Sequence, residues 1–76
     1  MKLYRYYSLH RPVGIGTYPK GGVQHIHNFD FRQYVPAIGR EAWGWIEYLR
    51  ELTEKEVNDY ELAYCGSYEG YGGGML

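Results

Sequence analysis

Apolar and polar residues alternate with a period of two along three segments of the chain, which is the pattern of β-strands. The segments are 2–9 (KLYRYYSL), 23–31 (VQHIHNFDF) and 42–49 (AWGWIEYL). Both faces of the first segment are largely apolar, so we expect it to be central in a sheet or covered. Glycines and prolines concentrate in 10–22 and 32–40, which are therefore predicted to be loops.

The segment 42–49 places Gly44 between two tryptophans, Trp43 and Trp45. A helix there would lose about 1 kcal/mol at the glycine relative to alanine, so the alternation favours a strand. A glycine inside a strand leaves space into which another backbone or ring can approach closely.

A helix start is specified just after this strand. Thr53 is an N-cap residue, and Glu56 three residues later completes a capping box. Leu52 and Val57 occupy the positions of a hydrophobic staple. The pattern predicts a helix over 53–60.

These elements predict the fold class α+β: a small antiparallel sheet of three to four strands packed with one short C-terminal α-helix. One or both tryptophans are expected to pack beneath that helix. Residues 61–65 (ELAYC) are predicted to form a short last strand or edge, which completes a single domain over 1–65. Residues 66–76 are rich in glycine and tyrosine, and we expect a flexible tail.

Size and composition narrow the class of protein. A domain of 76 residues buries only about 60% of the surface that its unfolded chain exposes. The ten tyrosines supply core area and also favour interfaces, so a homodimer is one way to complete the core. No segment approaches the roughly 18 apolar residues of a membrane span. We expect a soluble cytoplasmic protein without a membrane partner.

Charge is divided unevenly along the chain. Residues 1–40 carry a net charge of +5 and residues 41–76 a net charge of −6. Three explanations remain open at this stage: two molecular faces of opposite sign, attraction between the two halves within the fold, and head-to-tail association of copies.

Four motifs, which follow one another within roughly residues 4–62, match the pattern of a known family. They are RPVGIGTYP, NFDFR, AWGWIEY and LTEKEVNDYEL. The set resembles a family of short proteins encoded on conjugative and phage-like mobile elements of Gram-positive gut bacteria. Neighbouring families on such elements include inhibitors of bacterial defence. The resemblance by itself implies no particular activity. Together with the many aromatic residues and the acidic second half, this association leads us to expect a non-enzymatic protein-binding module of a mobile element, with inhibition of a bacterial defence system by direct protein contact as its role.

The candidate residues for binding a protein partner are Trp43, Trp45, Glu51, Glu54 and Asp59. The acids could occupy a basic groove that the partner uses for nucleic acid, guided by the steering that charge provides. The alternative for these acids is an ordinary solvated helix face.

A second function is a small-molecule binder that sequesters a signalling nucleotide. Its anion site would use Arg5, Arg11, Lys20 and Arg32 together with aromatic rings. Extended nucleic acid is disfavoured as a partner, because the acidic second half would repel its backbone.

Metal binding and catalysis have weak signals. His25 and His27 form an HxH pair on one strand face, but no second pair of ligands such as CxxC accompanies them. Cys65 is the only cysteine. With His25 or His27 it could form a nucleophile and base, but the sequence identifies no oxyanion hole to accompany them. The sequence therefore predicts no metal site, no cofactor and no catalytic residue.

Overall fold

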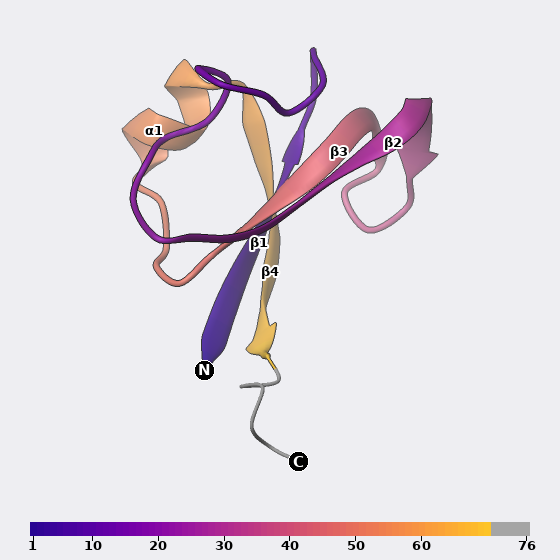
Figure 1. Ribbon diagram of the computed structural model, residues 1–76. Coiled ribbons are helices and arrows are strands. Elements are labelled where there is room, and N and C mark those ends of the chain that lie inside the picture. The colour runs from indigo at the N-terminus through magenta and orange to yellow at the C-terminus, as the bar shows by residue number, and fades with distance from the viewer. Residues whose placement is uncertain (71–76) are drawn as a thin grey trace.

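The computed structural model describes residues 1–70, which form one antiparallel sheet and one short helix (Figure 1). The spatial order of the strands is β2-β3-β1-β4, so β3 and β1 are central. The elements are β1 (Lys2–Ser8), β2 (Val23–Val35), β3 (Arg40–Tyr48), α1 (Glu54–Asp59) and β4 (Leu62–Glu69). The predicted α+β class, with a small antiparallel sheet and a single short helix, is confirmed.

The main core lies between the sheet and α1. Ile46 and Tyr48 of β3 are fully buried there with Tyr6 of β1, and Val57 and Tyr60 pack against them from the helix side. Burying apolar area of this kind is the main favourable contribution to folding.

Trp45 belongs to the second, smaller cluster, with Tyr7, Val35 and Ala42. Alternation along β3 explains this, because it turns Ile46 and Tyr48 toward α1 and Trp45 away from it. The prediction that a tryptophan seals the core beneath the helix is therefore wrong for Trp45. Trp43 is half-buried.

The polar tips of the buried tyrosines tie the connections to the sheet. The Tyr48 hydroxyl donates to the carbonyl of Pro19 at 2.7 Å, and the Leu52 amide donates to the Tyr6 hydroxyl at 2.8 Å. Burial raises the pKa of Tyr48, so the hydroxyl stays a donor. These bonds hold the long connection after β1 and the start of the helix segment on one face of the sheet.

The predicted loop 32–40 is mostly strand. Arg32 to Val35 continue β2, and Arg40 already belongs to β3. Only 36–39 form the turn, which is closed by the Ile38 amide donating to Val35 at 3.1 Å. Pro36 and Gly39 mark a tight hairpin turn, and the polar residues before it are those of an exposed edge strand rather than a loop.

The predicted last strand is also longer than expected. β4 continues to Glu69, and 66–69 pair with β1, so the predicted flexible tail is wrong over these residues. β4 contains a β-bulge opposite Arg5 and Tyr6, where its register with β1 shifts. Gly66 adopts a φ of +130° there, which glycine allows, and the strand continues beyond it. The rest of the predicted tail, 71–76, lies outside the described residues.

The capping box is confirmed in full. The Thr53 side chain accepts from the Glu56 amide at 3.1 Å, and the Glu56 carboxylate accepts from the Thr53 amide at 2.9 Å. Hydrogen bonds from Arg50, the largest effect, and from the Thr53 backbone lower the pKa of Glu56 to about 2.

Replacing Thr53 by alanine should destabilise the fold by about 1 kcal/mol, because one helix amide loses its acceptor. For a domain of this size the melting temperature should fall by roughly 4–8 °C, as measured by circular dichroism. Thr53→Ser keeps the hydroxyl and should melt close to the wild type. Equal losses in both variants would mean that the cap does not stabilise the helix.

Candidate functional site

The face of the sheet opposite α1 carries a buried carboxylate at its centre. Glu47 lies in β3 directly across from Arg5 of β1 on one side and from His25 of β2 on the other. Cross-strand neighbours of this kind are close enough for their side chains to interact. The Glu47 side chain is only 2% exposed.

Both carboxylate oxygens of Glu47 are hydrogen-bonded. Arg5 donates to Oε2 through Nε at 2.8 Å and Nη2 at 2.6 Å, and the Tyr68 hydroxyl donates to the same oxygen. His25 Nδ1 lies 3.0 Å from Oε1. Each of the other three strands thus supplies one partner, so side-chain contacts to Glu47 connect all four strands on this face.

Hydrogen bonds and neighbouring charges, rather than burial, set the direction in which the pKa values of Glu47 and Arg5 are shifted. Burial alone would raise the pKa of Glu47, but hydrogen bonds from Tyr68 and Arg5 outweigh burial and lower the pKa. For Arg5, burial alone would lower the pKa, because burial disfavours the charged guanidinium. The hydrogen bond and charge of Glu47 outweigh burial and raise the pKa of Arg5. Glu47 also raises the pKa of Tyr68. At neutral pH the cluster is an ion pair with a neutral tyrosine donor.

Aromatic rings surround the ion pair. The Arg5 guanidinium carbon lies 4.1 Å from the centre of the Trp45 ring, a cation–π contact, and His27 stacks on the same tryptophan at 5.5 Å. Phe29 extends the row beside His27 and Tyr7. These rings come from β1, β2 and β3, and no part of α1 packs with them.

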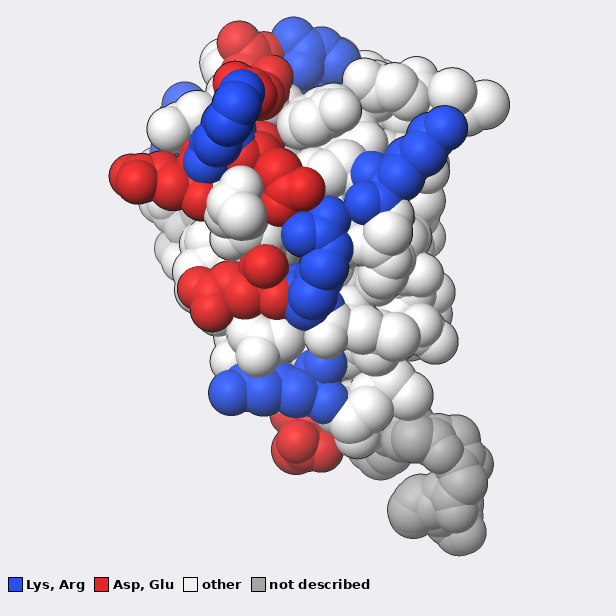
Figure 2. Space-filling view, turned by 90° about the vertical axis from the view of Figure 1, so that its left-hand side faces the viewer, with Lys and Arg blue, Asp and Glu red and all other residues white. Residues whose placement is uncertain are grey.

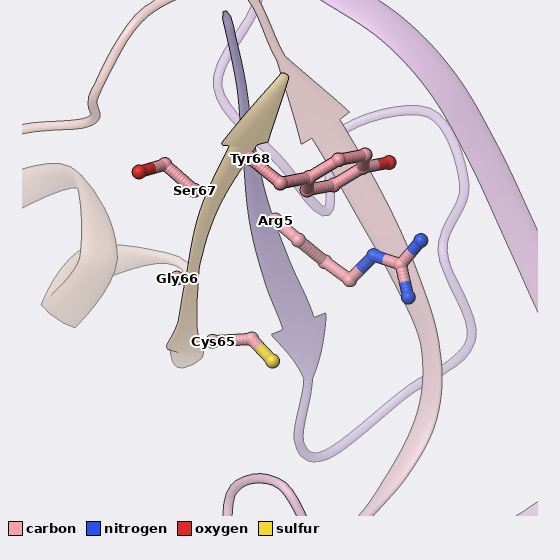
Figure 3. Close-up of a pocket in the computed structure, with 5 residues that line it drawn as sticks. All are labelled: Arg5, Cys65, Gly66, Ser67 and Tyr68. Atoms are coloured by element: carbon pink, nitrogen blue, oxygen red, sulfur yellow. The ribbon is translucent and has the colours of Figure 1, made fainter. Parts of the chain in front are cut away.

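A small hollow opens beside Arg5 along β4 (Figure 3). Its volume is about 230 Å³, and its lining residues are Arg5, Cys65, Gly66, Ser67 and Tyr68. The side chains of Arg5 and Tyr68 extend to the same side of the sheet, whereas Ser67 points the opposite way (Figure 3). Pockets for drug-sized ligands measure about 300–1,000 Å³, so this hollow is small for a nucleotide.

Comparison with known families adds a decisive observation. The family model described as Defence against restriction A C-terminal matches residues 1–67. The chain belongs to this family. No significant match was found among curated proteins or among solved structures.

Membership in the Defence against restriction A C-terminal family agrees with the sequence-based assignment to a family of mobile elements, because restriction acts on DNA that enters a cell. The match covers all four motifs of the resemblance and reaches into β4. It therefore includes Arg5, Trp45 and Glu47 but ends one residue before Tyr68.

In this member of the anti-restriction family, the residues predicted to bind a protein partner do not form one surface. Trp45 packs in the cluster that α1 does not contact, whereas Glu51, Glu54 and Asp59 lie on and beside α1. Trp43 is half-buried. All three acids are exposed, and Asp59 pairs with Lys55 at 2.6 Å. Acidic and basic side chains lie next to each other on this side of the molecule (Figure 2), so the acids do not form a purely negative surface.

Three of the four cations predicted to form an anion site are already paired. Arg5, Arg11 and Arg32 each pair with a different carboxylate, namely Glu47, Glu61 and Glu41. Lys20, the fourth, is exposed. Each of these pairs joins the basic first half of the chain to the acidic second half. The basic first half and the acidic second half of the chain therefore attract each other within the fold, as the second of the three explanations proposed.

The two histidines of the HxH pair have different neighbours, Glu47 for His25 and the Trp45 ring for His27. Within residues 1–70, no three His, Cys, Asp or Glu side chains are grouped as they would be around a metal ion. No helix in the same range is long and apolar enough to cross a membrane.

Sequence reasoning missed Glu47 and Tyr68 as site residues. A signal for Glu47 was present, since an acid alternates with two tryptophans on one side of a strand. Tyr68 gave no signal, because it lies in the segment predicted to be a tail.

Proposed function

We propose that this chain is a non-enzymatic protein-binding module that protects mobile-element DNA from restriction by direct contact with a protein of the host restriction system. Family membership supports the role in defence against restriction. The open sheet face supports the contact mechanism.

The observation that carries the proposal is the composition of that face. Tryptophan, tyrosine and arginine are the residues that most often dominate the free energy of protein–protein binding. Here Trp45, Arg5 and Tyr68 lie together on a face that α1 leaves uncovered. Tyr68 is 42% exposed and His25 is 56% exposed, so a partner can reach them.

The state of Glu47 favours binding over catalysis. It is the only charged side chain fully buried among residues 1–70, and both of its oxygens are already engaged. A general acid or base needs an oxygen within reach of the substrate. The Arg5–Glu47 pair instead fixes the tryptophan and tyrosine rings in place, which lowers the entropic cost of binding.

A transformation assay tests the proposal. Cells that carry a restriction system and express the chain should accept unmodified plasmid nearly as well as modified plasmid. Trp43→Ala and Trp45→Ala should abolish this protection, provided that thermal unfolding shows each variant to be folded. The triple variant Glu51→Lys, Glu54→Lys, Asp59→Lys should keep it, because its changes lie on the helix face.

The outcomes separate the possible contacts. If only the triple variant lost protection, the partner would bind the acids on and beside α1 rather than the open sheet face. Those acids would then occupy a basic groove that the partner uses for nucleic acid. No protection by the wild type against a panel of restriction systems would refute the function. Protection without binding to the purified restriction enzyme, measured by calorimetry, would refute the contact mechanism.

A further inference from the structure

The connection between β1 and β2 carries an isoleucine that has almost no contact with the rest of the protein. Ile15 is 97% exposed, more than any other large apolar residue within 1–70. The residues on both sides of it belong to the fold: Val13 and Pro19 are buried, and Tyr18 packs against the core that contains Val57 of α1. Ile15 is therefore the tip of an anchored segment rather than part of a loose loop.

Hydrogen bonds fix both ends of this segment to the sheet. Before the tip, the Asn28 side chain of β2 accepts from the Val13 amide at 2.8 Å and donates to the Val13 carbonyl at 2.9 Å. After the tip, the Pro19 carbonyl accepts from the buried Tyr48 hydroxyl at 2.7 Å. A segment that is already ordered loses less conformational entropy when a partner binds it.

The turn at the tip is closed by Thr17. Its amide donates to the Gly14 carbonyl at 3.0 Å. Its hydroxyl accepts from the Gly14 amide at 2.8 Å and donates to the Gly14 carbonyl at 2.7 Å. Gly16 has a φ of +83°, as the third position of a type II turn requires. Ile15 thus occupies the second position of a turn whose backbone is set before any partner binds.

The glycine before Ile15 is not required by the fold. The φ of Gly14 is not in the left-handed region, and a Cβ built there would meet no atom within 4 Å. The isoleucine therefore projects between two residues without side chains, so a partner can enclose it closely. Residues 10–22 also carry two cations, Arg11 and Lys20, and no acid. Acidic groups on a partner would complement them.

We infer that the turn 14–17 inserts Ile15 into an apolar pocket with an acidic rim on the host restriction protein. This inference rests on the proposed function, since the partner is the same. The turn is anchored on the side of the sheet that carries α1, whereas Trp45 lies on the other side. The chain measures 35 × 24 × 21 Å, so a cleft in a larger protein can reach both contacts.

Calorimetry with the purified restriction enzyme against which the wild type protects measures this contact. Ile15→Ala should raise the dissociation constant about fiftyfold and Ile15→Val about fourfold, because three buried carbons are lost in one case and one in the other. Thr17→Val removes the hydroxyl that fixes the turn and should weaken binding, whereas Thr17→Ser should not. Lys20→Glu should weaken binding most at low salt, where charges are least screened.

The matched control is Leu49→Ala, which truncates a leucine that is 47% exposed directly after β3 and should bind like the wild type. Ile15→Ala should keep the wild-type melting temperature in circular dichroism, because its side chain packs against nothing. In the double variant with Trp45→Ala the two fold-losses should multiply, since the sites share no contacts.

The outcomes distinguish this inference from the proposed function. Wild-type affinity in Ile15→Ala, or an equal loss in Leu49→Ala, overturns the inserted isoleucine. The proposed function then stands if Trp45→Ala still weakens binding. Wild-type affinity in Thr17→Val overturns the preformed turn, and in Lys20→Glu it overturns the acidic rim. If the wild type itself does not bind the enzyme, the contact mechanism and this inference fail together.

Discussion

Replacing Gly44 by alanine should lower the free energy of unfolding by about 3 kcal/mol, at the upper end of typical overpacking effects. A Cβ at this position would collide with the carbonyl oxygen of His27 and would lie 2.9 Å from Asn28 Oδ1. The carbonyl belongs to the backbone of β2, so it can move only if the β2–β3 pairing is disturbed. The Asn28 side chain is also fixed, because it binds both the amide and the carbonyl of Val13.

The expected fall in melting temperature is roughly 12–24 °C for a domain of this size, and thermal unfolding followed by circular dichroism measures it. Gly14→Ala is the matched control, because a Cβ there meets no atom within 4 Å. It should melt near the wild-type temperature. If Gly44→Ala were as stable as Gly14→Ala, the close approach of β2 to β3 would not exist in solution.

Replacing Glu47 by glutamine should destabilise the protein by about 2–3 kcal/mol at neutral pH. Breaking one half of a fully buried ion pair costs about 3–5 kcal/mol, and the effect is smaller here because Arg5 keeps 29% of its side chain exposed. Glutamine has nearly the same shape, so the loss reports the charge rather than a cavity. Chemical denaturation at pH 7 measures it.

The pH dependence of this difference has a definite sign. The pKa of Glu47 in the folded protein is lowered, below an unfolded value of about 4.3. Its contribution is therefore fully present above about pH 4.3 and is lost as the pH falls through the folded pKa. The gap in stability between wild type and Glu47→Gln should shrink as the pH falls below about 4.3.

The control for both measurements is Glu61→Gln. Its pair with Arg11 is exposed, with side chains 45% and 44% accessible, so water screens the attraction and the loss should be much smaller. Equal losses at Glu47 and Glu61 would mean that burial of the ion pair has no energetic consequence. A gap that stays constant down to acid pH would mean that the Glu47 carboxylate is not stabilised by the fold.

The sequence by itself determined the elements that depend on near neighbours. The alternation in 2–9, 23–31 and 42–49 located three strands, and Thr53 with Glu56 located the helix start, because both signals span only a few residues. The role of Gly44 as a point of close approach was also predictable, since only glycine offers that space within a strand. Errors arose where polarity suggested loops, in 32–35 and 66–69, which are edge segments of the sheet.

Only the tertiary structure decided the candidate site. Arg5, His25 and Tyr68 meet Glu47 across 42, 22 and 21 residues of sequence, and a shift of one residue in strand register would turn Glu47 to the other face. Register depends on which strands pair and on the bulges at Gly66 and at 29–32. No local pattern specifies those pairings, so the sequence could supply the residues of the site but not bring them together.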